Sequence, residues 1–271
     1  MNNRGLMVWT LFACASVGAA RGARAANLAS DNAADPAYNA GWTTGANGGS
    51  GFGAWSLSPV GSPPQFSYYI GSSASNGAAP PSGNVDASGK SWGLSNSIAD
   101  ACDATRTFTG GSLSVGQHVL VDMDNGPVAG AGFVELALRS GKNDRLEWLA
   151  NASTGQTYVF SNQQSPGIIS QVNTAIPFTS NGLHLDFSLT GADTFAVDAT
   201  PAGGTTHHFT GTLEGTSAAG IDTVEFLNYA AGTGPSHDLF FNNLAVTPEP
   251  AGLALLALIA PLLVRRRRAV G

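Results

Sequence analysis

The carboxylates on alternating segments are the first residues of this sequence that could do chemistry. Glycoside hydrolysis uses two closely placed carboxyl groups, and an E-x-D-x-E run would bring them to one face of a strand. The sequence has no such run: Glu135 and Glu147 stand among apolar neighbours, and Asp222 and Glu225 fall on opposite faces of an extended segment. Glu147 precedes Trp148 and could contact a sugar, but its place on an alternating strand predicts that Glu147 faces solvent.

The run DMDNG at 122–126 is a candidate for a cation. Asp122 and Asp124 alternate, Asn125 follows, and Ca²⁺ prefers six to eight such oxygen ligands. No glutamate completes the calcium loop of an EF-hand, and a plain Asp-Asn-Gly turn explains the same residues. Calcium is therefore the one cofactor that the sequence leaves open, and no other is expected.

The histidines and the cysteine do not form a catalytic or metal-binding pattern. His207 and His208 would point to opposite faces of a strand, and with His237 they are predicted to be surface residues. Cys14 falls in the N-terminal leader discussed below, so Cys102 is left as a single thiol, expected to be buried and inert. There is no G-x-S-x-G run, Cys–His pairing or phosphate loop in a useful context, so no enzyme is predicted.

Short alternating runs separated by turn residues dominate the middle of the chain and indicate strands. From Gln117 onward nine such runs recur every 8–14 residues, enough for an all-β, antiparallel β-sandwich over 27–246. GLHLDFSLTGADTFAVDATP predicts a hairpin with its tip at 190–193. The nine runs are QHVLVDMDNG, AGFVELALRSG, RLEWLA, QTYVFS, GLHLDFSLTG, DTFAVDATP, HHFTGTL, DTVEFLNYA and HDLFFNNLAV.

The segment before these strands is rich in glycine but is not predicted to be a linker. Trp42, Phe52 and Trp55 interleave with its glycines, and large aromatic residues of this kind anchor a segment to a core. The polar stretch at 71–91 is expected to be an exposed loop.

Charge separates the body of the chain from its ends. Residues 27–247 hold five basic and 17 acidic residues, a net charge of −12 against −6 for the whole chain. Such a surface repels nucleic acid, which is excluded as a partner, and suits an extracytoplasmic protein.

The N-terminus has the pattern of a secretory signal peptide. Arg4 precedes an apolar run of about 15 residues, and ARA at 23–25 supplies small residues at alternate positions. The run is shorter than the ~20 residues that span a membrane. Residues 1–26 are therefore predicted to be a signal helix, delivered to the general secretory translocon and removed by signal peptidase.

The C-terminus is predicted to be a short membrane anchor. Residues 251–264 form an uncharged run of 14 residues, about 21 Å as a helix against a hydrocarbon core of ~30 Å. Arg265, Arg266, Arg267 and Arg268 follow and resist crossing, so they are expected to stay in the cytoplasm. Residues 247–271 would hold the chain transiently in the inner membrane.

Pro248-Glu249-Pro250, the apolar run and the arginine cluster, in that order, resemble the PEP-CTERM sorting signal of Gram-negative bacteria. The resemblance implies recognition by an exosortase and removal of the tail during sorting to the cell surface or an exopolysaccharide matrix. The body resembles jelly rolls of the concanavalin A or laminin-G type and a domain that recurs in PEP-CTERM proteins, on GNVDASGKSWGLSN, DMDNG, GLHLDFSLTG and HDLFFNNLAV.

Together these features predict an exported, non-enzymatic surface or matrix protein with a lectin-like domain that could bind extracellular polysaccharide. Two alternatives stay open: a carbohydrate-active enzyme on the same sandwich, and a purely structural or adhesive subunit.

Overall fold

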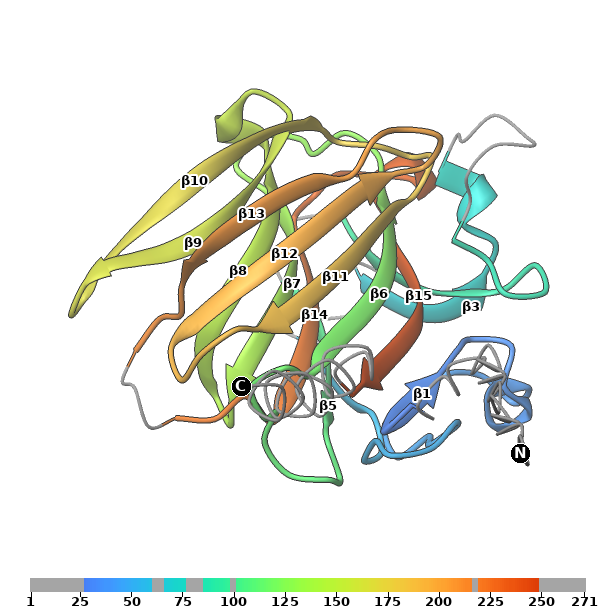
Figure 1. Cartoon of the computed structure of the whole chain (residues 1–271). Helices are drawn as coiled ribbons and strands as arrows, with labels where there is room; N and C mark the ends of the chain where they lie inside the picture. The colour runs from blue at the N-terminus through green and yellow to red at the C-terminus, as the bar shows by residue number, and fades with distance from the viewer. Residues whose placement is uncertain (1–26, 60–65, 77–84, 98–100, 216–218, 249–271) are drawn as a thin grey trace, which may run out of the picture. The chain divides into compact units, whose positions relative to one another are not determined.

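Strands account for nearly all the regular structure in the computed structural model (Figure 1). It describes residues 27–59, 66–76, 85–97, 101–215 and 219–248. The predicted signal helix, Glu249, Pro250, the apolar C-terminal run and Arg265–Arg268 lie outside these ranges. Within the described residues, no helix is long and apolar enough to cross a membrane.

The strands form two antiparallel sheets. The eight-stranded sheet has the order β13-β12-β11-β6-β15-β4-β3, with β1 paired to β15; the seven-stranded sheet has the order β10-β9-β8-β7-β14-β5-β2. The strands of the first are β13 (His207–Thr212), β12 (Thr194–Pro201), β11 (Leu183–Leu189), β6 (His118–Asn125), β15 (Leu239–Thr247), β4 (Ser91–Asn96), β3 (Phe66–Gly71) and β1 (Ala29–Asp31). Those of the second are β10 (Ile168–Pro177), β9 (Thr157–Ser165), β8 (Asn143–Asn151), β7 (Phe133–Ser140), β14 (Thr223–Tyr229), β5 (Ala101–Thr107) and β2 (Ser56–Pro59). Short 3₁₀ helices connect some of them: η1 (Pro36–Tyr38), η2 (Ser73–Asn76), η3 (Ala152–Thr154) and η4 (Pro235–His237).

The two sheets enclose one hydrophobic core, because successive side chains of a strand point to opposite faces. Val119 and Val121 of β6 are buried there, as are Leu136 and Leu138 of β7. Phe226 of β14 and Phe241 of β15 stack in parallel across the core with ring centroids 3.6 Å apart. The two sheets are therefore packed face to face through the side chains of consecutive strands that lie in different sheets.

The predicted all-β antiparallel architecture is confirmed. Each of the nine predicted runs contains a strand, from β6 to β9 and from β11 to β15, and β11 and β12 form the predicted hairpin. Strands β1 to β5 and β10 were not predicted individually. Strand β15 ends at Thr247, directly before Pro248.

The aromatic residues before β2 anchor the N-terminal segment, as predicted. Trp42, Phe52 and Trp55 are all buried in the core. The prediction of an exposed loop over 71–91 is wrong at Ser73 and Val85, which are buried.

Candidate functional site: a polar groove on the eight-stranded sheet

Three histidine–aspartate pairs lie on the outer face of the eight-stranded sheet, where the alternation of the strands directs polar residues. His184 of β11 stands directly opposite Asp122 of β6, and their side chains are bonded at 2.7 Å. The other two pairs also link neighbouring strands, at 2.7 and 2.6 Å; they are His118–Asp186 and His208–Asp198. This face therefore presents fixed hydrogen-bonding groups.

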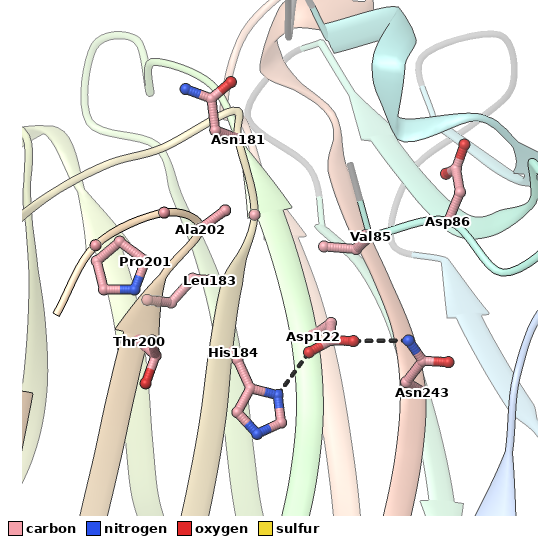
Figure 2. Close-up of a pocket in the computed structure, with 13 residues that line it drawn as sticks. Val85, Asp86, Asp122, Asn181, Leu183, His184, Thr200, Pro201, Ala202 and Asn243 are labelled. Atoms are coloured by element: carbon pink, nitrogen blue, oxygen red, sulfur yellow. Dashed lines mark hydrogen bonds and ion pairs between the residues drawn. The ribbon is translucent and has the colours of Figure 1, made fainter. Parts of the chain in front are cut away.

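A groove of about 300 Å³ opens at one end of this face (Figure 2). Strands β6, β11, β12 and β15 contribute to it, together with the loop that precedes β11, the loop that follows β12 and the segment before β4. Its lining residues are Val85, Asp86, Asp122, Asn181, Gly182, Leu183, His184, Thr200, Pro201, Ala202, Gly203, Gly204 and Asn243.

Asp122 organises the polar side of the groove. One carboxylate oxygen bonds to Nδ1 of His184 at 2.7 Å, and the other accepts a hydrogen bond from Nδ2 of Asn243 at 2.7 Å. Figure 2 shows the three side chains in a row across β11, β6 and β15. Since Nδ1 of His184 faces the carboxylate, the Nε2 atom and the amide oxygen of Asn243 are left for a ligand.

Asn243 reaches Asp122 because β15 is irregular at this point. The register between β15 and β6 shifts between Asn242 and Ala245, and Asn243 has a φ of +51°. Asparagine tolerates this left-handed conformation better than most residues, and a bulge changes the direction of a side chain. Asn242 is fully buried, and its side-chain oxygen accepts a hydrogen bond from the N–H of Ala33, whereas Asn243 is exposed at the groove.

The groove has an acidic character. The hydrogen bond to Asp122 is the largest cause that raises the pKa of His184, and Asp186 adds to the effect. Even with His184 protonated, Asp86 and Asp122 leave the lining with a net negative charge. An anionic ligand is therefore disfavoured, and an uncharged one that exchanges hydrogen bonds is favoured.

Two of the three predicted calcium ligands are bonded to other side chains or to the backbone. Asp122 is bonded to His184 and Asn243, and the side chain of Asn125 is bonded to Tyr158 and to the carbonyl of Gly126. In the part of the chain that the structure describes, no group of three or more His, Cys, Asp or Glu side chains could hold a metal ion.

Glu147, predicted to face solvent, is half-buried, and Glu135 of β7 is only 6% exposed. Glu147 of β8 and Glu225 of β14 lie in one row with the buried Ala137 of β7 between them. Arg139 pairs with Glu225 at 2.5 Å. Sequence alternation places side chains on a face but does not show how tightly their neighbours cover them.

These buried carboxyl groups have raised pKa values. Burial raises the pKa of Glu225 to about 7, although Arg139 acts against the shift. Burial and the neighbouring Glu214 raise the pKa of Glu147 to about 7. Burial and the charges of the neighbouring acids raise the pKa of Glu135 as well. The cluster thus holds protons near neutral pH.

The remaining predicted residues are placed as follows. His207 and His208 are exposed, as predicted, and His237 is half-buried with Nδ1 bonded to the carbonyl of Pro127 at 2.6 Å. Cys102 is a free, fully buried thiol, and burial raises its pKa to about 12, so it is inert as predicted. Pro248 follows β15 directly and is half-buried.

The groove itself was not found from the sequence. One signal was present, since His and Asp residues recur at alternate positions, as His118 and Asp122 of one run and as His184 and Asp186 of another. Cross-strand pairing could not be derived from these runs, because it depends on which strands become neighbours. The same holds for Asn243, whose direction depends on a bulge.

Comparisons with known proteins give only distant likenesses. No family model and no curated protein matches the chain. Among solved structures, galectin LEC-6 of Caenorhabditis elegans is similar with a TM-score of 0.36 at 18% identity, over 51% of this chain and 86% of that one. A carbohydrate esterase of the Shiga toxin-encoding bacteriophage phi24B has a TM-score of 0.45 at 15% identity, over 72% of this chain and 90% of the esterase. An endo-β-1,4-glucuronan lyase of Trichoderma reesei has a TM-score of 0.41 at 10% identity, over 70% of this chain and 90% of the lyase. Likenesses this distant transfer no site and no activity.

Proposed function

We propose that this chain is an exported, non-enzymatic surface or matrix protein whose lectin-like sandwich binds a neutral carbohydrate in the polar groove. The observation that carries the proposal is the bonded row of Asn243, Asp122 and His184 on adjacent strands. Groups that are already held in place lose little conformational entropy when a ligand binds. A sugar offers hydroxyl groups, which donate and accept hydrogen bonds, and carries no charge for the groove to repel.

A glycan array of neutral oligosaccharides, probed with the full-length chain, tests the groove. We expect at least one neutral glycan to bind, and binding to fall at least tenfold in His184→Ala and in Asn243→Ala. His208→Ala is the matched control, because His208 also pairs with an aspartate on the same face but does not line the groove. Absence of binding, or equal losses in all three variants, would contradict the proposal.

We also propose that the chain is processed at both ends during export. Support comes from the sequence alone: the signal-peptide pattern of residues 1–26 and the PEP-CTERM-like tail with Pro248, Glu249, Pro250 and Arg265–Arg268. The partners would be the secretory translocon, signal peptidase, an exosortase and the inner membrane.

Intact mass of the protein from its native host tests this processing. We expect a mass that lacks residues 1–25 and the tail beyond about Thr247. Replacing Pro248-Glu249-Pro250 with alanines should keep the tail in place, and replacing Arg265–Arg268 with serines should disturb anchoring. A mass that retains Arg265–Arg268 in the wild-type protein would refute tail removal.

A carbohydrate-active enzyme is the second candidate, and the carboxyl cluster around Arg139 favours it. Two carboxyl groups with raised pKa values are the kind of pair that glycoside hydrolysis uses. Their burial disfavours it, since Ala137 between them is inaccessible and Glu225 is only 8% exposed. Release of reducing sugar that disappears in both Glu147→Gln and Glu225→Gln would favour the enzyme; no release at any pH from 5 to 8 would favour the binding protein.

A further inference from the structure

An aromatic hollow of about 460 Å³ lies beside β3, at one edge of the eight-stranded sheet. It is separate from the groove and shares no lining residue with it. Its walls are the segment around η1 and the strand β3, and Lys90 stands at its border. The lining residues are Tyr38, Asn39, Gly41, Trp42, Thr43, Tyr68, Tyr69, Ile70 and Lys90.

The wall around η1 is rigidly held. The Tyr38 hydroxyl bonds to the buried carboxylate of Asp31 and accepts hydrogen bonds from Nε1 of Trp55 at 3.0 Å and from the N–H of Gly48 at 3.1 Å. The Trp42 ring packs edge-to-face on Tyr68 of the opposite wall, with centroids 5.9 Å apart. A hollow with fixed walls loses little conformational entropy when a ligand binds.

Lys90 gives this hollow a positive charge that is rare in the domain. Arg106 and Arg145 are buried, and Arg139 is paired with Glu225 and Asp144. Of the five cations among residues 27–247, all of which the structure describes, Lys90 and Lys142 are therefore the two that are neither buried nor paired with a carboxylate. An anion approaching this acidic domain meets a local attraction at the hollow.

The position of Lys90 is set by a tight turn. Ala87 and Lys90 exchange both backbone hydrogen bonds, and Ser88 and Gly89 between them have φ of +51° and +75°. Positive φ at both central residues is the geometry of a two-residue hairpin turn. Nζ of Lys90 then donates to the side chain of Asn39 at 3.1 Å, across the mouth of the hollow.

We propose that the aromatic hollow binds a carboxylated sugar, a hexuronate residue of an acidic polysaccharide. The C–H face of the pyranose ring would pack on the half-buried tyrosines of β3, because Tyr38 and Trp42 are almost completely buried, and its carboxylate would pair with Lys90. The inference deepens the proposed carbohydrate binding, but it uses a different site and a different class of sugar from the groove. Val85 and Asp86 line the groove and Lys90 borders the hollow, so one short turn separates the two sites.

Calorimetric titration of the full-length chain with tetragalacturonate tests the proposal. We expect binding that weakens as salt rises from 0.05 to 0.5 M, because exposed charges are screened. In Lys90→Gln the affinity should fall at least tenfold. Lys142→Gln is the matched control, since it removes an exposed lysine from the turn between β7 and β8, and it should bind like the wild type.

Two results would overturn the proposal: no binding of tetragalacturonate by the wild type, or equal binding by Lys90→Gln and the wild type. Asn243→Ala separates this site from the groove. It should keep tetragalacturonate binding and lose binding of the neutral glycan, whereas Lys90→Gln should show the opposite pattern. Loss of both ligands in Asn243→Ala would place them in one site and also contradict the proposal.

Discussion

Breaking the buried ion pair between Asp31 and Arg106 should strongly destabilise the N-terminal segment. Both side chains are inaccessible to solvent. Arg106 also donates to the carbonyls of Gly53 at 2.6 Å and Gly48 at 2.8 Å, and its guanidinium lies 4.9 Å from the centre of the Phe52 ring. These other partners are neutral, so Asp31 is the group that balances the arginine charge.

Asp31→Asn keeps the shape of the side chain but removes its charge. Burial raises the pKa of Asp31 even though Arg106 lowers it, which indicates that desolvation offsets much of the attraction. The intact pair therefore adds little net stability, whereas breaking it leaves an arginine buried without a counter-charge. Removal of one partner of a buried pair costs about 3–5 kcal/mol, a large part of the roughly 5–15 kcal/mol that stabilises an ordinary domain.

Urea denaturation followed by tryptophan fluorescence measures this loss, and Trp42 and Trp55 report from the same segment. The control is Asp198→Asn, since Asp198 belongs to an exposed pair with side chains 49% and 63% accessible, and its change should stay within about 1 kcal/mol. The double variant Asp31→Asn/Arg106→Met should be less destabilised than the sum of its single variants. A loss below about 1 kcal/mol in Asp31→Asn, equal to the control, would refute the reasoning.

Three further predictions concern the folded domain. The free energy of unfolding should fall by on the order of 3 kcal/mol as pH rises from about 4.5 to about 7, because the Glu225 carboxyl ionises first in the unfolded chain and keeps its proton in the folded one. Urea midpoints measured at several pH values should show this decrease, and the decrease should be smaller in Glu225→Gln. Gly126→Ala should cost about 2 kcal/mol or more in thermal or urea unfolding, because its Cβ would lie 1.9 Å from the carbonyl oxygen of Ser236, whereas Gly110→Ala meets open space and should change little. Asn243→Ala should lower the free energy of unfolding by about 1 kcal/mol more than Asn243→Gly does, because glycine tolerates the φ of +51° and alanine does not. Both variants lose the contact with Asp122, so the difference between them reports the backbone strain alone.

The sequence predicted the strands best where polar and apolar residues alternate strictly. QHVLVDMDNG and GLHLDFSLTG have one apolar face each, and both became strands with the expected side buried. Strand β10 was missed because Ile168 and Ile169 are exposed at its start and the polar Thr174 is on its buried side, so apolar and polar residue types do not alternate along GIISQVNTAIP. Burial against a core produces alternation, and a strand that is mostly exposed has no such constraint.

The candidate sites depend on pairings that local patterns cannot show. Asp122 was singled out as a calcium ligand, but its partner His184 lies 62 residues away on a strand that could pair elsewhere. Lys90 was assigned to an exposed loop, although the turn that carries it closes against Asn242, whose amide donates to the Lys90 carbonyl at 2.7 Å. Long-range strand order decides both neighbourhoods, and order in a sheet is not encoded in any single run.

The pairing of β1 with β15 sets a limit on where the chain can be processed at either end. Ala29 stands opposite Val246, and the N–H of Leu28 bonds to the Val246 carbonyl at 2.8 Å. Thr247 closes the ladder to β6 opposite His118. A signal peptide removed after Ala25 or Ala26 and a tail removed beyond Thr247 would leave every one of these bonds in place. Cleavage four residues earlier would remove Leu244 and Val246, two buried residues of the core, and the first strand would lose its partner. The two proposed cleavages are therefore compatible with the fold only within a few residues of where the two motifs place them.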